Sequence, residues 1–543
     1  MARNIDAIFS LHLASIQWLE NYTGIEYPFQ KFDFAAIPAF QYGGMEHVGA
    51  IQYRADGLFL EEDASTSQLL SRANLIAHET AHMWFGDLVT MDWFNDVWTK
   101  EVFANFMAAK IVNPSFPDID HDLGFRIRSY PQAYSVDRTE GANPIRQDLE
   151  NLNEAGSLYG AIIYNKAPIM MQQLEAIVGE KLFQEGIQDY LSLYAFDNAT
   201  WPNLIEILDD KFPEDLKAWS EVWVNTPGRP EFHLDSISEK EARFSLEQGD
   251  PLGLGRVWPQ SFGVADVNNL PQKWTIEYKS TKENLPKGIN KKNLFINSDG
   301  RGYGLFPVSK NFLQENWDYF SDLQKGSFFI NLYEQLLENN NTIYPMEYIE
   351  LINWTLERED NQLLLNLLSS QLGQIYWSLL TNTQRVHLAP ILEKRLWAIM
   401  TEKSDVPATK KIFFNMFQNI ALTTKSVEKL YQIWQKKMTP TGLSLSIRDY
   451  TNLAGELAIK APNLSQFIIE TQVKNITNPD RKRRFEFISP SLSADVEVRD
   501  AFFQSLYFSE NREVESWVEA ALGYLHHPLR LNTSEKYLLK SLE

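Results

Sequence analysis

Two histidines flank a glutamate at a spacing that can hold a metal ion: His78, Glu79 and His82. Residues four apart lie on one face of a helix with Cβ atoms roughly 6 Å apart, so both imidazoles can reach one ion at about 2.0–2.1 Å. Among nine histidines and 71 acidic residues in 543, chance produces this pattern roughly once in a hundred such chains. The spacing therefore predicts a metal site, against the alternative of a surface helix with a histidine pair.

Glu101 is the candidate third ligand, nineteen positions after His82 with eighteen residues between them. After a turn at Gly86, a second helix packed beside the first can present this carboxylate to the same ion. Two histidines and one glutamate leave one position open for water, which is the arrangement of a catalytic zinc. We therefore predict one Zn2+ per chain and amide hydrolysis as the chemistry, with Glu79 as the general base that accepts a proton from the activated water.

These side chains require two helices and a nearby strand edge. We expect the first helix to start near residues 63–65 and to run to Gly86, where glycine can take the left-handed C-terminal cap. The second helix is expected over roughly Trp98 to Ile111. The stretch from Phe32 to Ile51 contains proline and three glycines among β-formers, which predicts short strands joined by tight turns.

The rest of the chain divides by its hydrophobic pattern. Apolar residues recur at helical spacing over residues 5–20, with Gly24 as a stop, and again from about 154 to 224. A cluster of prolines and glycine at 226–230 marks a boundary, after which apolar and polar residues alternate. From about Phe312 the chain is leucine-rich and helical. We predict domains at 1–230, 231–311 and 312–543.

The motifs resemble those of the aminopeptidase N-like zinc aminopeptidases of the gluzincin group. Their H-E-x-x-H motif followed after eighteen residues by Glu is matched by the three predicted ligands and Glu79, and the flanking residues 83–90 are also similar. Residues 43–47 resemble the family's G-x-M-E-N motif, and residues 164–166 resemble its Y-x-K-G motif. The resemblance implies a multidomain α+β fold: a thermolysin-like zinc catalytic domain, a small β-sandwich domain and a C-terminal α-helical array of HEAT/armadillo type.

The resemblance also assigns roles to residues around the metal. Tyr164 is implied as the phenol that donates to the oxyanion, and Tyr159 could line the same wall. Without the family, Tyr164 would be taken as a core tyrosine of an amphipathic helix. Met45 is a further candidate for the substrate pocket.

The residues themselves suggest how a free N-terminus is bound. A carboxylate beside a glycine-rich strand can pair with an ammonium group, which makes Glu46 the candidate amine anchor. Gly43 and Gly44 would let a substrate backbone approach that strand edge. The alternative for Glu46 is a surface carboxylate on a hairpin.

Three positions depart from the family pattern. His47 stands where the family has Asn, at a position associated with the substrate main chain. Lys100 and Val102 flank Glu101 where the family has Asn and Gly. A cation beside a ligand carboxylate could compete with zinc if it pointed inward, and we expect Lys100 to point to solvent instead. Ala167 and Pro168 replace the glycine of the third motif, which could reshape the helix start near Tyr164.

The amino-acid composition disfavours or excludes some classes of binding partner and ligand. A formal net charge of −21 and a pI near 5.0 disfavour nucleic acid, because an acidic surface repels phosphate backbones. The chain has no cysteine, which excludes disulfides and thiolate ligands. It has no apolar run of the length of a transmembrane helix and does not open as a signal peptide, so we expect a soluble protein whose compartment and oligomeric state are open.

Three functions follow from these observations. The first is a zinc aminopeptidase acting on peptides with a free N-terminus. The second is a catalytically weak or inactive peptide-binding member of the same fold, motivated by His47, Lys100, Val102 and by the small number of residues before Gly43, too few for the family's N-terminal β domain. An endopeptidase of the wider gluzincin group is disfavoured by Glu46.

Overall fold

The computed structural model is mostly helical and describes residues 2–62, 64–238, 243–267, 273–278, 280–285, 293–338, 342–402 and 406–542. It divides into two compact units. The first unit comprises Met1–Ala35, Gly44–Gln52 and Ser67–Tyr344, and the second comprises Ala36–Gly43, Tyr53–Thr66 and Pro345–Glu543. The predicted division into three domains stays a prediction.

The first 230 residues carry the elements that position the predicted site. In chain order the longer elements are α1 (Ile5–Thr23), β1 (Phe34–Ile37), β2 (Gly44–Met45), β3 (Ile51–Arg54), α2 (Ala55–Leu58), α3 (Thr66–Ala81), β4 (Val89–Met91), α4 (Val97–Ser115), α5 (His121–Asp137), the π-helix η4 (Ile162–Lys166), α6 (Ala167–Val178), α7 (Glu180–Leu193), β5 (Asp197–Ala199), α8 (Trp201–Asp209) and α9 (Leu216–Val224). Short 3₁₀ turns stand at η1 (Ala2–Asn4), η2 (Phe94–Asp96) and η3 (Leu152–Leu158). Strands β1, β3 and β2 form a sheet in that order, and β4 pairs in parallel with β5.

Helix α1 ends as its sequence predicts. Gly24 takes the left-handed conformation with φ 71°, and its N–H donates to the Glu20 carbonyl. Glycine adopts this conformation without the steric cost that a Cβ would bring. Along the helix, Ile8, His12 and Leu19 are buried, which is the one-sided pattern expected of a helix packed on a core.

Helix α3 ends five residues earlier than predicted, at Ala81 and not at Gly86. Its last hydrogen bonds tighten, since the N–H groups of Met83 and Trp84 donate to carbonyls three residues back. The predicted start region includes Asp63, which lies outside the described residues, and the helix itself begins at Thr66. The second predicted helix is α4, which starts at Val97 and runs four residues beyond Ile111.

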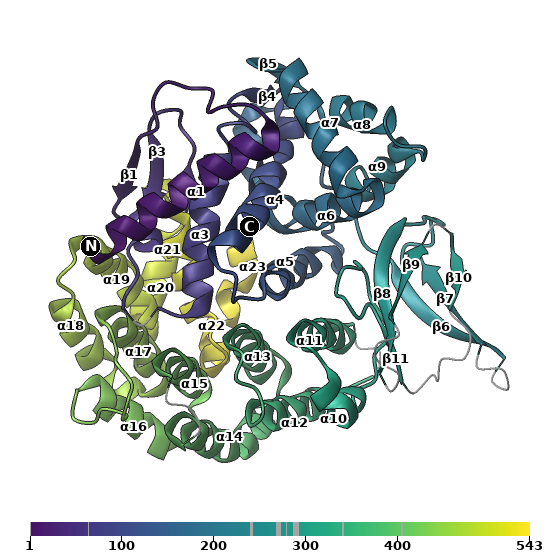
Figure 1. Cartoon of the computed structure of the whole chain (residues 1–543). Helices are drawn as coiled ribbons and strands as arrows, with labels where there is room; N and C mark the ends of the chain where they lie inside the picture. Colours follow the sequence, from purple (N-terminus) through teal and green to yellow (C-terminus); the bar gives the residue numbers. More distant parts are fainter. Residues whose placement is uncertain are drawn as a thin grey trace. The chain divides into compact units, whose positions relative to one another are not determined.

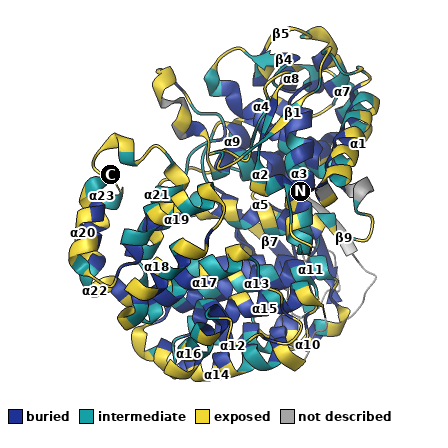
Figure 2. Cartoon of the chain, turned by 90° about the vertical axis from the view of Figure 1, so that its left-hand side faces the viewer, coloured by how far each residue is buried: buried dark blue, intermediate teal, exposed yellow. Residues whose placement is uncertain are grey.

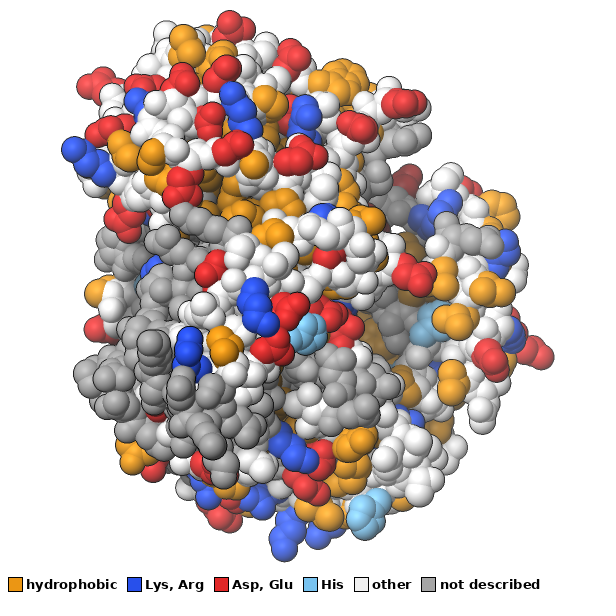
Figure 3. All heavy atoms as spheres, turned by 90° about the vertical axis from the view of Figure 1, so that its right-hand side faces the viewer, with side chains coloured by type: hydrophobic (Ala, Val, Ile, Leu, Met, Phe, Trp, Pro, Cys, Tyr) orange, Lys and Arg blue, Asp and Glu red, His pale blue; other side chains and the backbone are white. Residues whose placement is uncertain are grey.

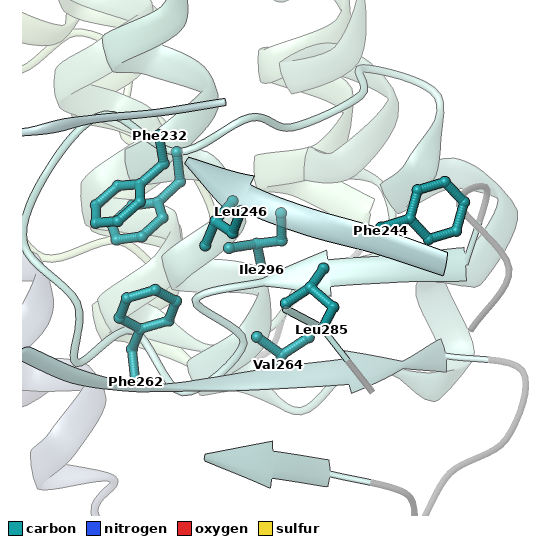
Figure 4. Close-up of a cluster of buried hydrophobic side chains, with 8 residues drawn as sticks. Phe232, Phe244, Leu246, Phe262, Val264, Leu285 and Ile296 are labelled. Carbon is teal, nitrogen blue, oxygen red and sulfur yellow. The ribbon is translucent and has the colours of Figure 1, made fainter. Parts of the chain in front are cut away.

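A β-rich segment follows Pro230, as the alternating pattern predicts. Its strands are β6 (Glu231–Ser238), β7 (Arg243–Gly249), β8 (Gln260–Asp266), β9 (Lys273–Tyr278), β10 (Lys282–Asn284) and β11 (Leu294–Ile296). Two antiparallel three-stranded sheets result, in the orders β10-β7-β6 and β11-β8-β9. Both sheets contribute to one apolar cluster, in which Phe232 and Leu246 face Phe262 and Val264 (Figure 4).

Helices α10 (Phe312–Asn316) and α11 (Asp322–Leu337), with the turn η7 (Trp317–Tyr319) between them, complete the first unit. The second unit is helical after Pro345. Its longer helices are α12 (Pro345–Leu356), α13 (Gln362–Gln374), the π-helix η8 (Ile375–Leu379), α14 (Asn382–Glu402), α15 (Pro407–Ile420), α16 (Thr424–Trp434), α17 (Ile447–Lys460), α18 (Ser465–Asn475), α19 (Pro479–Leu492), α20 (Val496–Ser505) and α21 (Glu515–Leu525). Two short helical turns lie between these helices, η9 (Pro462–Leu464) and η10 (Ser509–Asn511), and four short elements follow α21: η11 (Pro528–Arg530), α22 (Leu531–Ser534), η12 (Glu535–Tyr537) and α23 (Leu538–Leu542).

Within this unit the helices form two rows. In Figure 1, α12, α14, α16 and α18 make one row, and α13, α15 and α17 make the other. Buried and exposed residues share the same helices, as the colours of Figure 2 show for α14 and α16. This is a helical array in which each helix buries one stripe of side chains.

The surface carries the charge that the composition predicts. Acidic side chains are distributed over the face drawn in Figure 3, interspersed with basic and apolar ones. Among the described residues, every helix is too short or too polar to cross a bilayer.

Candidate metal centre and active site

The donor atoms of the three predicted ligands lie together in the first unit. His78 Nε2 and His82 Nε2 are 3.1 Å apart, and Glu101 Oε2 lies 3.4 Å from the first and 3.7 Å from the second. A tetrahedral ion with bonds of about 2.05 Å holds its ligand atoms about 3.3 Å from one another. The donor set of this chain therefore fits a tetrahedral zinc ion.

The ring of His82 is oriented by the turn that follows α3. Its Nδ1–H donates to the Phe85 carbonyl over 3.0 Å, and the side chain is 1% exposed. A hydrogen bond from Nδ1 leaves the lone pair on Nε2 free to bind a metal. The early end of α3 makes this contact possible, because it brings a carbonyl of the turn beside the ring.

Gly86 lets the first helix and α4 approach. It has φ 128°, and a Cβ there would lie 3.2 Å from Lys100 Cβ and 3.3 Å from His82 Nδ1. The conformation and the close contacts both favour glycine. Gly86 is thus needed where the end of α3 and the turn after it, which carry the two histidines, approach α4, which carries Glu101.

The start of α4 is held by ion pairing outside the metal ligands. Arg146 binds the buried Asp96 with two hydrogen bonds, of 2.7 and 3.1 Å, and Thr99 Oγ donates to the Asp96 carbonyl over 2.7 Å. A planar two-point contact of this kind fixes orientation as well as distance. It holds the helix turn that carries Glu101, whose side chain is 5% exposed.

Glu79 is buried next to the ligand atoms and against glycine. Its carboxylate lies within 4.8 Å of the donor atoms of both His78 and His82, and a Cβ at Gly44 would be only 2.1 Å from Glu79 Oε1. Burial raises the pKa of Glu79 to about 8; the nearby His78 opposes this shift and Glu46 adds to it. A carboxylate whose pKa lies near neutrality is suited to accept and return a proton.

Lys100 points into the site, so the expectation that it faces solvent is wrong. Its Nζ lies 2.5 Å from Glu46 Oε1 and 3.5 Å from Glu101 Oε1, with 18% of the side chain exposed. Burial alone would lower the pKa of Lys100, but the Glu101 and Glu46 carboxylates raise it above its usual value. The pKa of Glu46 is about 2, because His82 and Lys100 outweigh the effect of burial. Lys100 and Glu46 therefore form a charged pair.

The rings of Tyr164 and Tyr159 are neighbours, and Tyr164 lies within electrostatic reach of the carboxylates of the site. Their ring centroids are 6.3 Å apart, and Tyr159 is 37% exposed. Burial raises the pKa of the Tyr164 phenol well above its usual value, and the charges of Glu101, Tyr159, Glu46 and Glu79 add to the shift. The phenol thus keeps its proton at neutral pH and can act as a hydrogen-bond donor.

The remaining predicted substrate residues lie on the glycine-rich segment. Gly44 and Met45 form β2 and are half-buried, while Gly43 and His47 are exposed. The carbonyl of His47 accepts a hydrogen bond from the Ala50 N–H, and the Gly43 carbonyl accepts one from Arg54 N–H. The Glu46 carboxylate lies within 4.8 Å of donor atoms of His82 and Glu101, two of the predicted metal ligands.

A buried ion pair supports Tyr164 and was not predicted. Lys166 is fully buried; its Nζ lies 2.7 Å from Asp137 Oδ2 and donates to the Gly228 carbonyl over 2.9 Å. The same Asp137 oxygen accepts from the Tyr303 phenol over 2.9 Å. Lys166 thereby ties the π-helix η4 to α5 and to the loop before β6. A lysine in a predicted helix gives no sequence signal for so distant a partner.

Comparison with known families places the site within a matched domain. A "Peptidase family M1 domain" matches residues 9–223. The match spans all three predicted ligands, Glu79, Glu46 and Tyr164.

Curated relatives cover parts of this chain. "Probable aminopeptidase 1" of Sulfurisphaera tokodaii is 31% identical over 54% of this chain and 38% of its own length. "Leucyl aminopeptidase" of Saccharolobus solfataricus is 34% identical over 44% of this chain and 30% of its own length. "Aminopeptidase N" of Streptomyces lividans is 35% identical over 42% of this chain and 28% of its own length. The chain thus spans less than half the length of these relatives.

Proposed function

We propose, from the match of residues 9–223 to the peptidase family M1 domain, that the chain is a zinc-dependent aminopeptidase that hydrolyses the N-terminal peptide bond of peptides. The observation that carries the proposal is the convergence of His78 Nε2, His82 Nε2 and Glu101 Oε2 within 3.7 Å of one another, with the buried Glu79 carboxylate beside them. Relatives named as aminopeptidases support the same reaction.

The proposed mechanism assigns one task to each residue. A zinc ion bound by the three ligands would supply Lewis acidity and an acidified water. Glu79 accepts the proton of the attacking water and passes it to the leaving amine. The Tyr164 phenol donates a hydrogen bond to the developing oxyanion. Glu46 is the carboxylate that can pair with the α-ammonium of the substrate.

The finer architecture is part of the proposal. We assign 1–230 to a thermolysin-like catalytic domain, 231–311 to a small β-sandwich and 312–543 to a HEAT/armadillo-like array. The two sheets that share one apolar cluster support the second assignment, and the two rows of helices support the third.

Two glutamate variants test the mechanism. Glu79→Gln should keep one zinc per chain but lose about 10²–10⁴-fold in hydrolysis of an aminoacyl anilide, because it removes the base and no ligand. Glu101→Gln should lose zinc and activity together, because it weakens the ligand set. Metal content by mass spectrometry of the native protein and initial rates give both readouts. Full activity of Glu79→Gln would refute the proposal.

The Lys100–Glu46 pair favours a second candidate, a catalytically weak peptide-binding member of the family. A zinc-loaded chain that binds a peptide with a free N-terminus but turns it over no faster than Glu79→Gln would establish this alternative. A matched N-acetylated substrate serves as the control for an endopeptidase, which would cleave both forms at similar rates.

A further inference from the structure

The inward position of Lys100 is built into the surrounding elements. Its aliphatic stem passes Gly86, where a Cβ would lie 3.2 Å from Lys100 Cβ and 3.4 Å from its Cδ. Any side chain at that position would press on the stem. The Lys100 side chain can therefore extend from α4 to Glu46 because the turn after α3 carries a glycine.

The Lys100 side chain ends at Glu46, the carboxylate proposed to bind the substrate amine. Lys100 Nζ lies 2.5 Å from Glu46 Oε1, and the two side chains are only 18% and 14% exposed. Glu101 Oε1 also lies near this ammonium group, at 3.5 Å. A buried carboxylate with one cation in contact has less attraction left for a second one.

We propose that Lys100 is a specificity-determining residue, whose ammonium group occupies Glu46 and weakens the preference of the site for a protonated substrate N-terminus. The inference rests on the proposed function and changes its substrate class. A peptide with a free α-ammonium must displace or share the lysine contact. A peptide with an N-acyl group carries no charge there and does not compete with Lys100. The chain should therefore bind free and N-acylated peptides with similar affinity, while faster cleavage of the free form still distinguishes an aminopeptidase from an endopeptidase.

The charge of Lys100 should also weaken the binding of zinc by the proposed ligand Glu101. Glu101 Oε2 belongs to the ligand set, while its Oε1 faces the lysine ammonium. A positive charge at that distance disfavours a divalent cation on the same carboxylate. Removal of the Lys100 charge should raise zinc affinity without any change in the ligands.

Calorimetric binding to a non-hydrolysing protein tests the specificity. The background is zinc-loaded Glu79→Gln, and the probes are tetra-alanine amide with a free or an acetylated N-terminus. With Lys100 present, the two Kd values should agree within about threefold, and Lys100→Met should increase the preference for the free amine at least about tenfold. Lys100→Gln gives a second uncharged variant if the methionine variant does not fold.

Two lysine controls separate charge from general disturbance. Lys100→Arg keeps the cation and should keep the ratio of Kd values. Lys110 lies on the same helix α4 and pairs with Glu175 over 2.8 Å, so Lys110→Met removes an equivalent ion pair away from the ligands and should leave the ratio unchanged. An unchanged ratio in both Lys100→Met and Lys100→Gln would overturn the inference, as would a preference of about a hundredfold for the free amine with Lys100 in place.

Zinc affinity gives a readout that needs no peptide. In competition with a chelator, Lys100→Met should bind zinc about tenfold more tightly than the unchanged chain. Equal affinities would contradict the proposed position of the charge. Failure of every variant to bind either peptide would refute the proposed function and this inference with it, whereas binding with an unchanged ratio would refute the inference alone.

Discussion

At the scale of single residues, Gly44 limits where the Glu79 carboxylate can lie. The position of a Cβ at Gly44 is only 2.1 Å from Glu79 Oε1, well inside van der Waals contact. Either the glutamate or the strand would have to move to admit a methyl group. The glycine thus serves the proposed base directly, in addition to any substrate that pairs with the strand.

Gly44→Ala should therefore lower kcat about 10²-fold with zinc still bound, because a displacement of about 1 Å at a catalytic group has an effect of that size. Initial rates and metal content provide the measurement. Gly523→Ala is the control, since outside the backbone of its own helix α21 and its chain neighbours no atom lies within 4 Å of a Cβ there. Normal kcat in Gly44→Ala would show that Glu79 can lie elsewhere.

Also at the scale of single residues, the buried His12 should make the free energy of unfolding depend on pH. It is 3% exposed, donates from Nδ1 to the Ile8 carbonyl over 2.8 Å and stacks on Phe34. Burial lowers the pKa of His12 to about 4, against 6.5 in its unperturbed form. Between these values the unfolded chain binds more protons than the folded one, so the free energy of unfolding falls as pH drops from about 6.5 to 4.

The contribution of His12 to this fall is at most roughly 3 kcal/mol. His12→Gln has no titrating group and should flatten the dependence on pH over this window. Denaturant unfolding of the two proteins at several pH values gives the comparison. Identical slopes would mean that His12 does not titrate as its burial requires.

At the scale of elements, the pair of Lys166 and Asp137 holds η4 to α5. Both side chains are fully buried, and Asp137 also accepts from Tyr303. Because Tyr164 lies two residues before Lys166 in the same π-helix, this pair also fixes the backbone that carries the proposed oxyanion donor. Removal of one member would leave a buried charge without its partner.

Lys166→Met should lower the free energy of unfolding by about 3–5 kcal/mol. Lys181→Met is the matched control, because Lys181 pairs with Glu185 on the surface of α7 and is 89% exposed, so its loss should cost less than about 0.5 kcal/mol. Urea unfolding measures both. Similar values for the two variants would contradict the role given to the buried pair.

At the scale of the whole molecule, all three proposed metal ligands belong to the first unit. Binding of zinc to the folded state alone should therefore stabilise that unit by about 2.7 kcal/mol when free zinc is a hundred times its Kd. Calorimetric unfolding with zinc and with EDTA should show a shift in the transition of the first unit, and Glu101→Gln should reduce it. An equal shift in that variant would place the metal elsewhere.

The sequence by itself predicted the ligand set and the order of the elements. The spacing of His78 and His82 acts within one helix, where 3.6 residues per turn fix which side chains meet. Hydrophobic periodicity likewise predicted the strands after Pro230 and the helices after Phe312, because each periodicity reflects one buried face. The exact end of α3 was missed, since a turn that bonds three residues back leaves no distinct pattern.

Tertiary structure alone decided the direction of Lys100. The lysine is adjacent to Glu101 in sequence, but helix geometry turns neighbours about 100° apart, so the position of Glu101 does not set the direction of Lys100. Its partner Glu46 lies 54 residues earlier and is brought to it by packing. The contact of Gly44 with Glu79 and the pairing of Lys166 with Asp137 have the same origin. A long side chain among distant charges follows their positions, and only the folded chain sets those positions.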